Sequence, residues 1–307
     1  MVDTVPEKHF LDTSVVRPIL LGSAPYRRYF EDQFRDNPLY ISKYVQMEFK
    51  RSYLCPILDF YFVLHMPAVE TVGDAFQIWS NRFKSSELKA ILQLVGQLID
   101  DRSLDLSDPR DKKKALRAVG FYAKRVEMKL RRSFKDIGSN STRCARSKVS
   151  FSIRDMSELT RILRSFLEQF NDVETCRSRC IVDDFILKRY RSQVEGYVEQ
   201  ASGLSKLRSQ ENKGFTRIAQ NLEKILHNGP DICSCHRCKA IGDAVIALET
   251  PREMRLEHTD HYAGASRLRN GAVDCHPLLM GVSRRITTLA PSGPAFSATS
   301  SIRKKER

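Results

Sequence analysis

The sequence contains no long hydrophobic run. Its richest apolar stretch, Tyr53–Met66, is interrupted by Pro56, Asp59 and His65, so it lacks the length and apolar character of a transmembrane helix. The first residues, Met1 to Lys8, are polar and do not form the apolar segment of a secretory signal. We therefore expect a cytoplasmic protein that does not act at a membrane. Its eight cysteines should be reduced thiols or metal ligands rather than disulfides.

Strand signals are nearly absent from the middle third of the chain, where Val149–Ile153 is the one candidate. Helical patterns occupy this region instead, as in Asp155–Phe170, whose apolar residues share one face. Residues 8–60, by contrast, have the pattern strand–helix–strand–helix, which is typical of an α/β layer structure. The predicted segments are an α/β domain in two parts, 1–64 and 231–286, a helical insertion at 65–230 with a basic stretch, and a disordered tail at 287–307.

Basic residues outnumber acidic ones, 51 against 37, which gives a formal net charge of +14. This excess favours polyanionic partners, nucleic acid above all. It is concentrated between Arg110 and Arg154, where aromatic residues such as Phe121 and Tyr122 alternate with the charges. Phosphate attraction combined with base stacking would explain this pattern, whereas a solvated helix face or an acidic protein partner is the alternative. The residues predicted to bind nucleic acid are Lys112, Lys113, Lys114, Lys124, Arg125, Arg131 and Arg132.

Four acidic residues lie at the ends of predicted elements, next to apolar sequence that would anchor them. Asp12 follows a short apolar strand, and Glu48 lies in the helix after the second strand, for which Ser42 is the expected N-cap. Asp243 begins an apolar helix, and Asp260 follows a short strand at Arg255–His258. Open α/β sheets bind ligands at the carboxyl ends of their strands, so these acids are candidates for one site. Each acid alone is equally explained as a turn residue or a helix cap.

The order and spacing of these acids resemble those of PIN-domain nucleases. Phe10-Leu-Asp-Thr-Ser-Val15 resembles the opening of that family, a strand that ends in Asp-Thr-Ser or Asp-Thr-Asn. Glu48 follows 36 residues later, as the second acid of the family does. Gly242-Asp-Ala-Val-Ile-Ala247 is similar to the motif of the third acid, and Asp260 follows it by 17 residues. The gap of 195 residues between the second and third acids is much longer than in the family.

The resemblance implies a three-layer α/β domain with a central, mostly parallel sheet. It also implies a metal-dependent endonuclease that hydrolyses phosphodiester bonds, most often in RNA. Clustered carboxylates cannot all stay ionised without a cation, and Mg²⁺ or Mn²⁺ prefers oxygen ligands. Asp12, Glu48, Asp243 and Asp260 would be both the catalytic acids and the ligands, and Ser14 and Thr259 would support them by hydrogen bonds.

Cysteines cluster just before the third acid. Cys233, Cys235 and Cys238 could hold a structural Zn²⁺, with Cys176, Cys180 or Cys275 as the fourth ligand. Such an ion would brace the loop in front of Asp243. A reduced cysteine-rich loop without metal is the simpler alternative, because free cysteine is a common small buried residue.

The preferred hypothesis is thus a PIN-like ribonuclease whose substrate is nucleic acid, RNA before DNA, with a helical insertion that could also bind a protein partner. Two alternatives stay open. One is a protein of the same fold that has lost its activity and serves as a nucleic-acid-binding or scaffold protein. The other is a helical interaction protein in which the acids are only surface caps.

Overall fold

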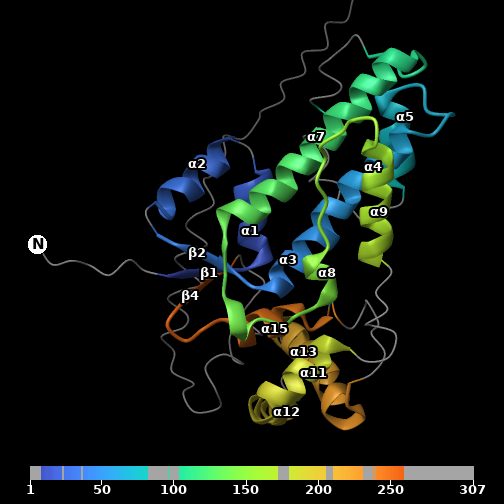
Figure 1. Cartoon of the computed structure of the whole chain (residues 1–307). Helices are drawn as coiled ribbons and strands as arrows, with labels where there is room; N and C mark the ends of the chain where they lie inside the picture. Colours follow the sequence, from blue (N-terminus) through green and yellow to red (C-terminus); the bar gives the residue numbers. More distant parts are fainter. Residues whose placement is uncertain are drawn as a thin grey trace, which may run out of the picture.

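The protein is described by a computed structural model over residues 8–81 except 23 and 36, residue 96, 104–171, 180–204, 210–230 and 238–258 except 239. It is a mixed α/β protein that is mostly helical and has one small parallel sheet (Figure 1). The sheet has four strands in the order β3-β2-β1-β4. In the described part of the chain, no helix combines the length and the apolar character needed to cross a bilayer.

The strands are short, and β1, one of the two inner strands, is buried. They are β1 (His9–Leu11), β2 (Leu39–Ile41), β3 (Lys135–Asp136) and β4 (Arg255–Glu257). The predictions of β1, β2 and β4 are confirmed. The predicted strand at Val149–Ile153 is wrong, because these residues adopt no strand and β3 forms earlier in the chain. The two residues of β3 are exposed and polar, so no apolar pattern marks them.

The helices before β3 and the helix before β4 cover opposite faces of the sheet. β1, β2 and β3 follow one another in one direction across the sheet, whereas the chain returns from β3 to the far edge at β4. Right-handed crossovers therefore place the first group on one face and α15 (Gly242–Glu249) on the other, as Figure 1 shows. The first group comprises α1 (Thr13–Leu21), α2 (Ala24–Gln33), α3 (Lys43–Phe49), the π-helix η1 (Lys50–Leu54), α4 (Cys55–Leu64), α5 (Val72–Ser80) and α7 (Pro109–Ser133).

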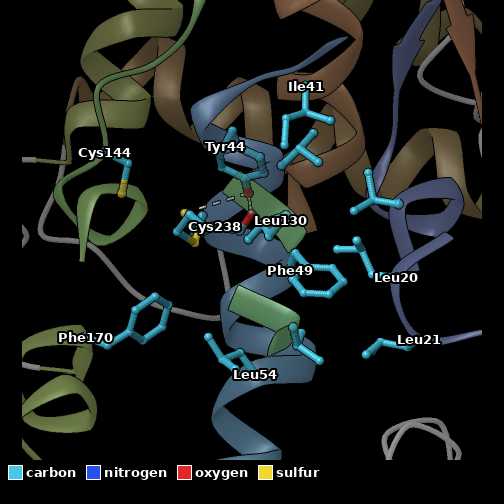
Figure 2. Packing of buried hydrophobic residues seen from close by; sticks show 14 of the residues in the cluster. Leu20, Leu21, Ile41, Tyr44, Phe49, Leu54, Leu130, Cys144, Phe170 and Cys238 are labelled. Carbon is cyan, nitrogen blue, oxygen red and sulfur yellow. Dashed lines mark hydrogen bonds between the residues drawn. The ribbon is translucent and has the colours of Figure 1, made fainter. Parts of the chain in front are cut away.

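The connection from β3 to α15 is helical. Its described elements are the 3₁₀ turn η2 (Gly138–Asn140), α8 (Ala145–Lys148), α9 (Leu159–Asn171), α11 (Ile181–Arg189), α12 (Arg191–Leu204) and α13 (Gln210–Asn228). Buried apolar residues of this connection join those of the sheet layer in one continuous core (Figure 2). The division at residues 65 and 230 stays a prediction, and α7 and β3 belong to the sheet layer although they lie within 65–230.

A buried lysine links this connection to the sheet layer. Lys50, at the start of η1, is 2% exposed, and its Nζ donates hydrogen bonds of 2.6 Å to the carbonyl oxygens of Ser147 and Val149. Its charge also interacts with Glu127 of α7, which is fully buried and accepts a 2.7 Å hydrogen bond from Arg131. A buried charge is tolerated only when it is paired in this way.

Replacing Lys50 with methionine should lower the free energy of unfolding by about 2–4 kcal/mol, because two buried carbonyl groups lose their donor and Glu127 loses one of its two cationic neighbours. Chemical denaturation monitored by circular dichroism measures the change. The control is Lys148→Met, whose exposed side chain lies in the same connection and should change stability by less than about 0.5 kcal/mol. Equal losses in the two variants would contradict the role assigned to Lys50.

Candidate functional site

Asp12 lies at the carboxyl end of β1 and caps α1, the helix that follows. Its side chain accepts hydrogen bonds from the Ser14 backbone nitrogen at 3.2 Å and from Ser14 Oγ at 2.5 Å. This is the structural role of an N-cap residue. Asp12 is nevertheless only 6% exposed, and burial raises its pKa although the bonds from Ser14 act in the opposite direction.

Glu48 reaches the same region from the last turn of α3. That helix begins where the sequence predicted, with Ser42 Oγ accepting a hydrogen bond from the Val45 backbone nitrogen. The carboxylate of Glu48 accepts a 2.6 Å hydrogen bond from Oγ1 of Thr13, the residue next to Asp12. The π-helix η1 begins two residues later, and such turns are frequent at functional sites. The side chains of α1 and α3 are thereby joined beside Asp12.

Asp243 completes the group from the first turn of α15. Gly242, just before it, packs so closely that a Cβ atom there would lie 3.5 Å from Glu48 Oε1 and 3.4 Å from the Tyr44 hydroxyl. Glycine therefore gives α15 its close approach to α3. The structure thus brings Asp12, Glu48 and Asp243 together, although 195 residues separate the second from the third.

The electrostatics of the three carboxyl groups are mutually unfavourable. Burial, with further contributions from Asp12 and Asp243, raises the pKa of Glu48 to about 7. Burial and the charge of Asp12 raise the pKa of Asp243 to about 6. Acids that raise each other's pKa in this way form a region where a cation is favoured.

Basic and aromatic side chains that the sequence analysis did not identify surround this group. The charge of Arg51 lowers the pKa of Glu48, and His258 does the same for Asp12. The Arg17 guanidinium lies over the Tyr53 ring, 5.4 Å from its centroid. Arg51 follows Glu48 by three residues, and this helical spacing is a signal that could have identified it. His258 had no such signal beyond its place after a strand.

The fourth predicted acid, Asp260, and its neighbour Thr259 lie outside the described residues. Within the described ranges, no three or more His, Cys, Asp or Glu side chains form a group that could hold a metal ion. A ligand set would therefore need at least one group outside the described residues.

Of the three predicted zinc ligands, Cys238 is described, whereas Cys233 and Cys235 lie outside the described residues. Cys238 is buried, and its carbonyl oxygen accepts a 2.5 Å hydrogen bond from the Tyr44 hydroxyl (Figure 2). Tyr44 precedes Glu48 by one helical turn, so this bond fixes the segment before Asp243 against the helix that carries Glu48.

The predicted nucleic-acid-binding residues differ in their partners. Lys112 Nζ and Lys124 Nζ donate 2.6 Å hydrogen bonds to the carbonyl oxygens of Met66 and Ile153, which ties α7 to neighbouring segments. Arg131 and Lys114 pair with acids of α7 itself, Glu127 and Asp111. The predicted residues that lie exposed on α7 are Lys113, Lys114, Arg125, Arg131 and Arg132.

Comparison with known proteins adds no relative: no protein-family model matches the chain, and neither a curated protein nor a solved structure does. The function must therefore be inferred from the site itself.

Replacing Glu48 with glutamine should stabilise the protein at pH 8 in a chelating buffer, by about 1–2 kcal/mol in the free energy of unfolding. The pKa of Glu48 is about 7 in the folded protein and about 4.5 in the unfolded chain. The folded protein therefore loses stability as the pH rises through this range. Glutamine keeps the oxygen that Thr13 needs but carries no charge. Denaturation at pH 8 and pH 5 should show the gain at pH 8 only. The control is Glu253→Gln, which changes an exposed acid and should leave the free energy of unfolding unchanged at both pH values. If Glu48→Gln stabilised the protein equally at pH 5 and pH 8, the repulsion between ionised carboxylates would be contradicted.

Proposed function

We propose that the protein is a metal-dependent endonuclease that hydrolyses phosphodiester bonds, with RNA as the preferred substrate. One observation carries the proposal: three buried carboxyl groups from distant parts of the chain lie within electrostatic reach of one another, and the charge of Asp12 raises the pKa of both Glu48 and Asp243 beyond the effect of burial. A structural role would not require them to meet. Helix capping accounts for Asp12, and the helix dipole accounts for an acid in the first turn of α15, but neither explains why Glu48 lies beside them.

The proposed fold is PIN-like. Two features agree with this proposal. The sheet is all-parallel with helices on both faces, and the first acid comes directly after β1. The long helical connection between β3 and α15 accounts for the distance between the second and third acids in the sequence.

The donor set suits Mg²⁺ or Mn²⁺, because the three groups are carboxylates whose mutual repulsion a divalent cation would relieve. Asp12, Glu48 and Asp243 would hold the ion, and Asp260 would supply the further ligand that the described residues lack. When bound, such an ion lowers the pKa of water and stabilises the charge that develops on a phosphate.

The protein's own groups would orient the reactants. Thr13 holds the Glu48 carboxylate through its 2.6 Å hydrogen bond, and Ser14 holds that of Asp12. Arg51 would bind the phosphate, because its Nη2 is buried and has no hydrogen-bond partner among the described residues. Arginine is suited to this role by its fixed donors and permanent charge. A nonbridging phosphate oxygen would satisfy this donor.

A protein that binds nucleic acid without cleaving it is the second candidate. It is favoured by the absence of a complete metal-ligand group among the described residues. In that case the carboxylates would be neutralised by protons, as their raised pKa values allow near neutral pH. Two further proposals hold under either function: a structural Zn²⁺ at Cys233, Cys235 and Cys238, and a protein partner bound by the helical connection.

Replacing Asp12 or Asp243 with asparagine should lower Mn²⁺-dependent cleavage of a single-stranded RNA by at least about a hundredfold, because each change removes a carboxylate from the proposed metal site. Cleavage is followed on a labelled oligonucleotide by gel electrophoresis, with and without EDTA. Asp136→Asn is the matched control, since Asp136 is an exposed acid on β3 that pairs with Lys43. Cleavage by both variants at the rate of the control would exclude the proposed mechanism. No cleavage by the wild-type protein would favour the second candidate.

A further inference from the structure

Helix α7 presents one continuous basic face to solvent. The exposed residues of this face are three, four or seven positions apart, which places them on one side of the helix. From the first to the last this face extends about 33 Å at the rise of an α-helix. Each charged side chain of α7 that lies exposed is basic, while Asp111 is half-buried and Glu127 is buried. The residues that define this outward face are Arg110, Lys114, Arg117, Phe121, Arg125 and Arg132.

An aromatic side chain lies in the middle of this face. Phe121 is 49% exposed and is the large apolar side chain that remains exposed among the described residues. Arg117 precedes it by one turn and Arg125 follows it by one turn, and the Arg125 guanidinium also lies 5.7 Å from the centroid of the Tyr122 ring. Aromatic rings between cations are the arrangement on which successive unpaired bases stack.

A pocket of about 330 Å³ opens beside the same helix, where the segment that leads to α9 passes α7 (Figure 1). Three cations line it, and the buried Glu127 offsets one of them. Its other walls are largely apolar, so it combines an anion site with a surface for a base. The residues that line the pocket are Lys124, Met128, Arg131, Arg132, Phe151 and Ser152.

We propose that the outward face of α7 and this pocket together bind a single-stranded polynucleotide. Arg117, Arg125 and Arg132 contact its phosphates, and one base stacks on Phe121. Arg117 and Arg132 make no hydrogen bond or ion pair with any described residue, so their charges are available to a ligand. A double-stranded ligand is a poorer fit, because its bases are stacked inside the duplex and none could stack on Phe121. An acidic protein is also a poorer fit, because it would have no need of the exposed ring. The inference rests on the proposed function only for the expectation that this strand is the substrate.

The test is equilibrium binding of the full chain to a fluorescently labelled single-stranded RNA of 12 nucleotides, followed by anisotropy in EDTA at several salt concentrations. EDTA prevents metal-dependent cleavage, so binding is measured apart from the proposed activity. The double variant Arg125→Gln/Arg132→Gln should weaken binding about tenfold. It should also lower the slope of log K against log salt by about 1.4, because a single strand contributes about 0.7 for each phosphate contact.

Phe121→Ala should weaken binding of the single strand about tenfold with no change in salt slope, and should not affect binding of a duplex of equal length. The matched control is Lys188→Gln/Arg191→Gln, which removes the same charge from the exposed side chains of α11 and α12 and should bind like the wild type. Arg117→Gln/Arg132→Gln replaces the first pair if that variant does not fold.

Three results would overturn the proposal. The α7 variants could bind as the control pair does. Phe121→Ala could leave binding of the single strand unchanged. A free mononucleotide could displace the strand at equal concentration, which would make the pocket a nucleotide site. Asp12→Asn should bind the strand normally, so loss of cleavage with binding retained affects the proposed function and leaves this surface in place.

Discussion

The repulsion between three buried carboxyl groups is the physical constraint on which the candidate site depends. Asp12 caps α1, whereas Glu48 and Asp243 lie on α3 and α15, and hydroxyl groups of Ser14 and Thr13 hold the first two carboxylates. Such an arrangement costs stability near neutral pH unless a proton or a cation offsets the charge. Under the proposed function a divalent ion, which fits carboxylate oxygens, would offset the charge.

The rest of the structure holds these groups together. The Tyr44 hydroxyl fixes the segment around Cys238 in front of α15, and Gly242 lets that helix approach α3. Lys50 ties the helical connection to η1, two residues beyond Glu48. The connection is thereby part of the support of the site. The basic face of α7 would then be the surface that attracts a polyanion to an otherwise acidic centre.

Local sequence determined what could be predicted. The buried run before Asp12, the Ser42 cap and the apolar helix after Asp243 are each marked by residues close in the chain, and all three were found. The strand β3 was missed because its two exposed polar residues are held by pairing with β2, which no local pattern records. His258 was missed for a similar reason, since only the fold brings it to the carboxylates, whereas the helical spacing of Arg51 from Glu48 was a local signal that was not used. The basic residues of α7 were predicted as one set, whereas in the structure Lys112 and Lys124 bond to backbone carbonyl groups of other segments.

If the three carboxylates share a divalent ion, its binding should release the protons that they carry. Calorimetric titration with Mn²⁺ in buffers of different ionisation enthalpy tests this most directly, because comparing the buffers counts the released protons. With the pKa of Glu48 at about 7 and that of Asp243 at about 6, we expect about one proton per ion at pH 6.5 and almost none at pH 8.5. Glu48→Gln should bind more weakly and release fewer protons at pH 6.5. Absence of saturable binding, or binding with no proton release at pH 6.5, would contradict the account.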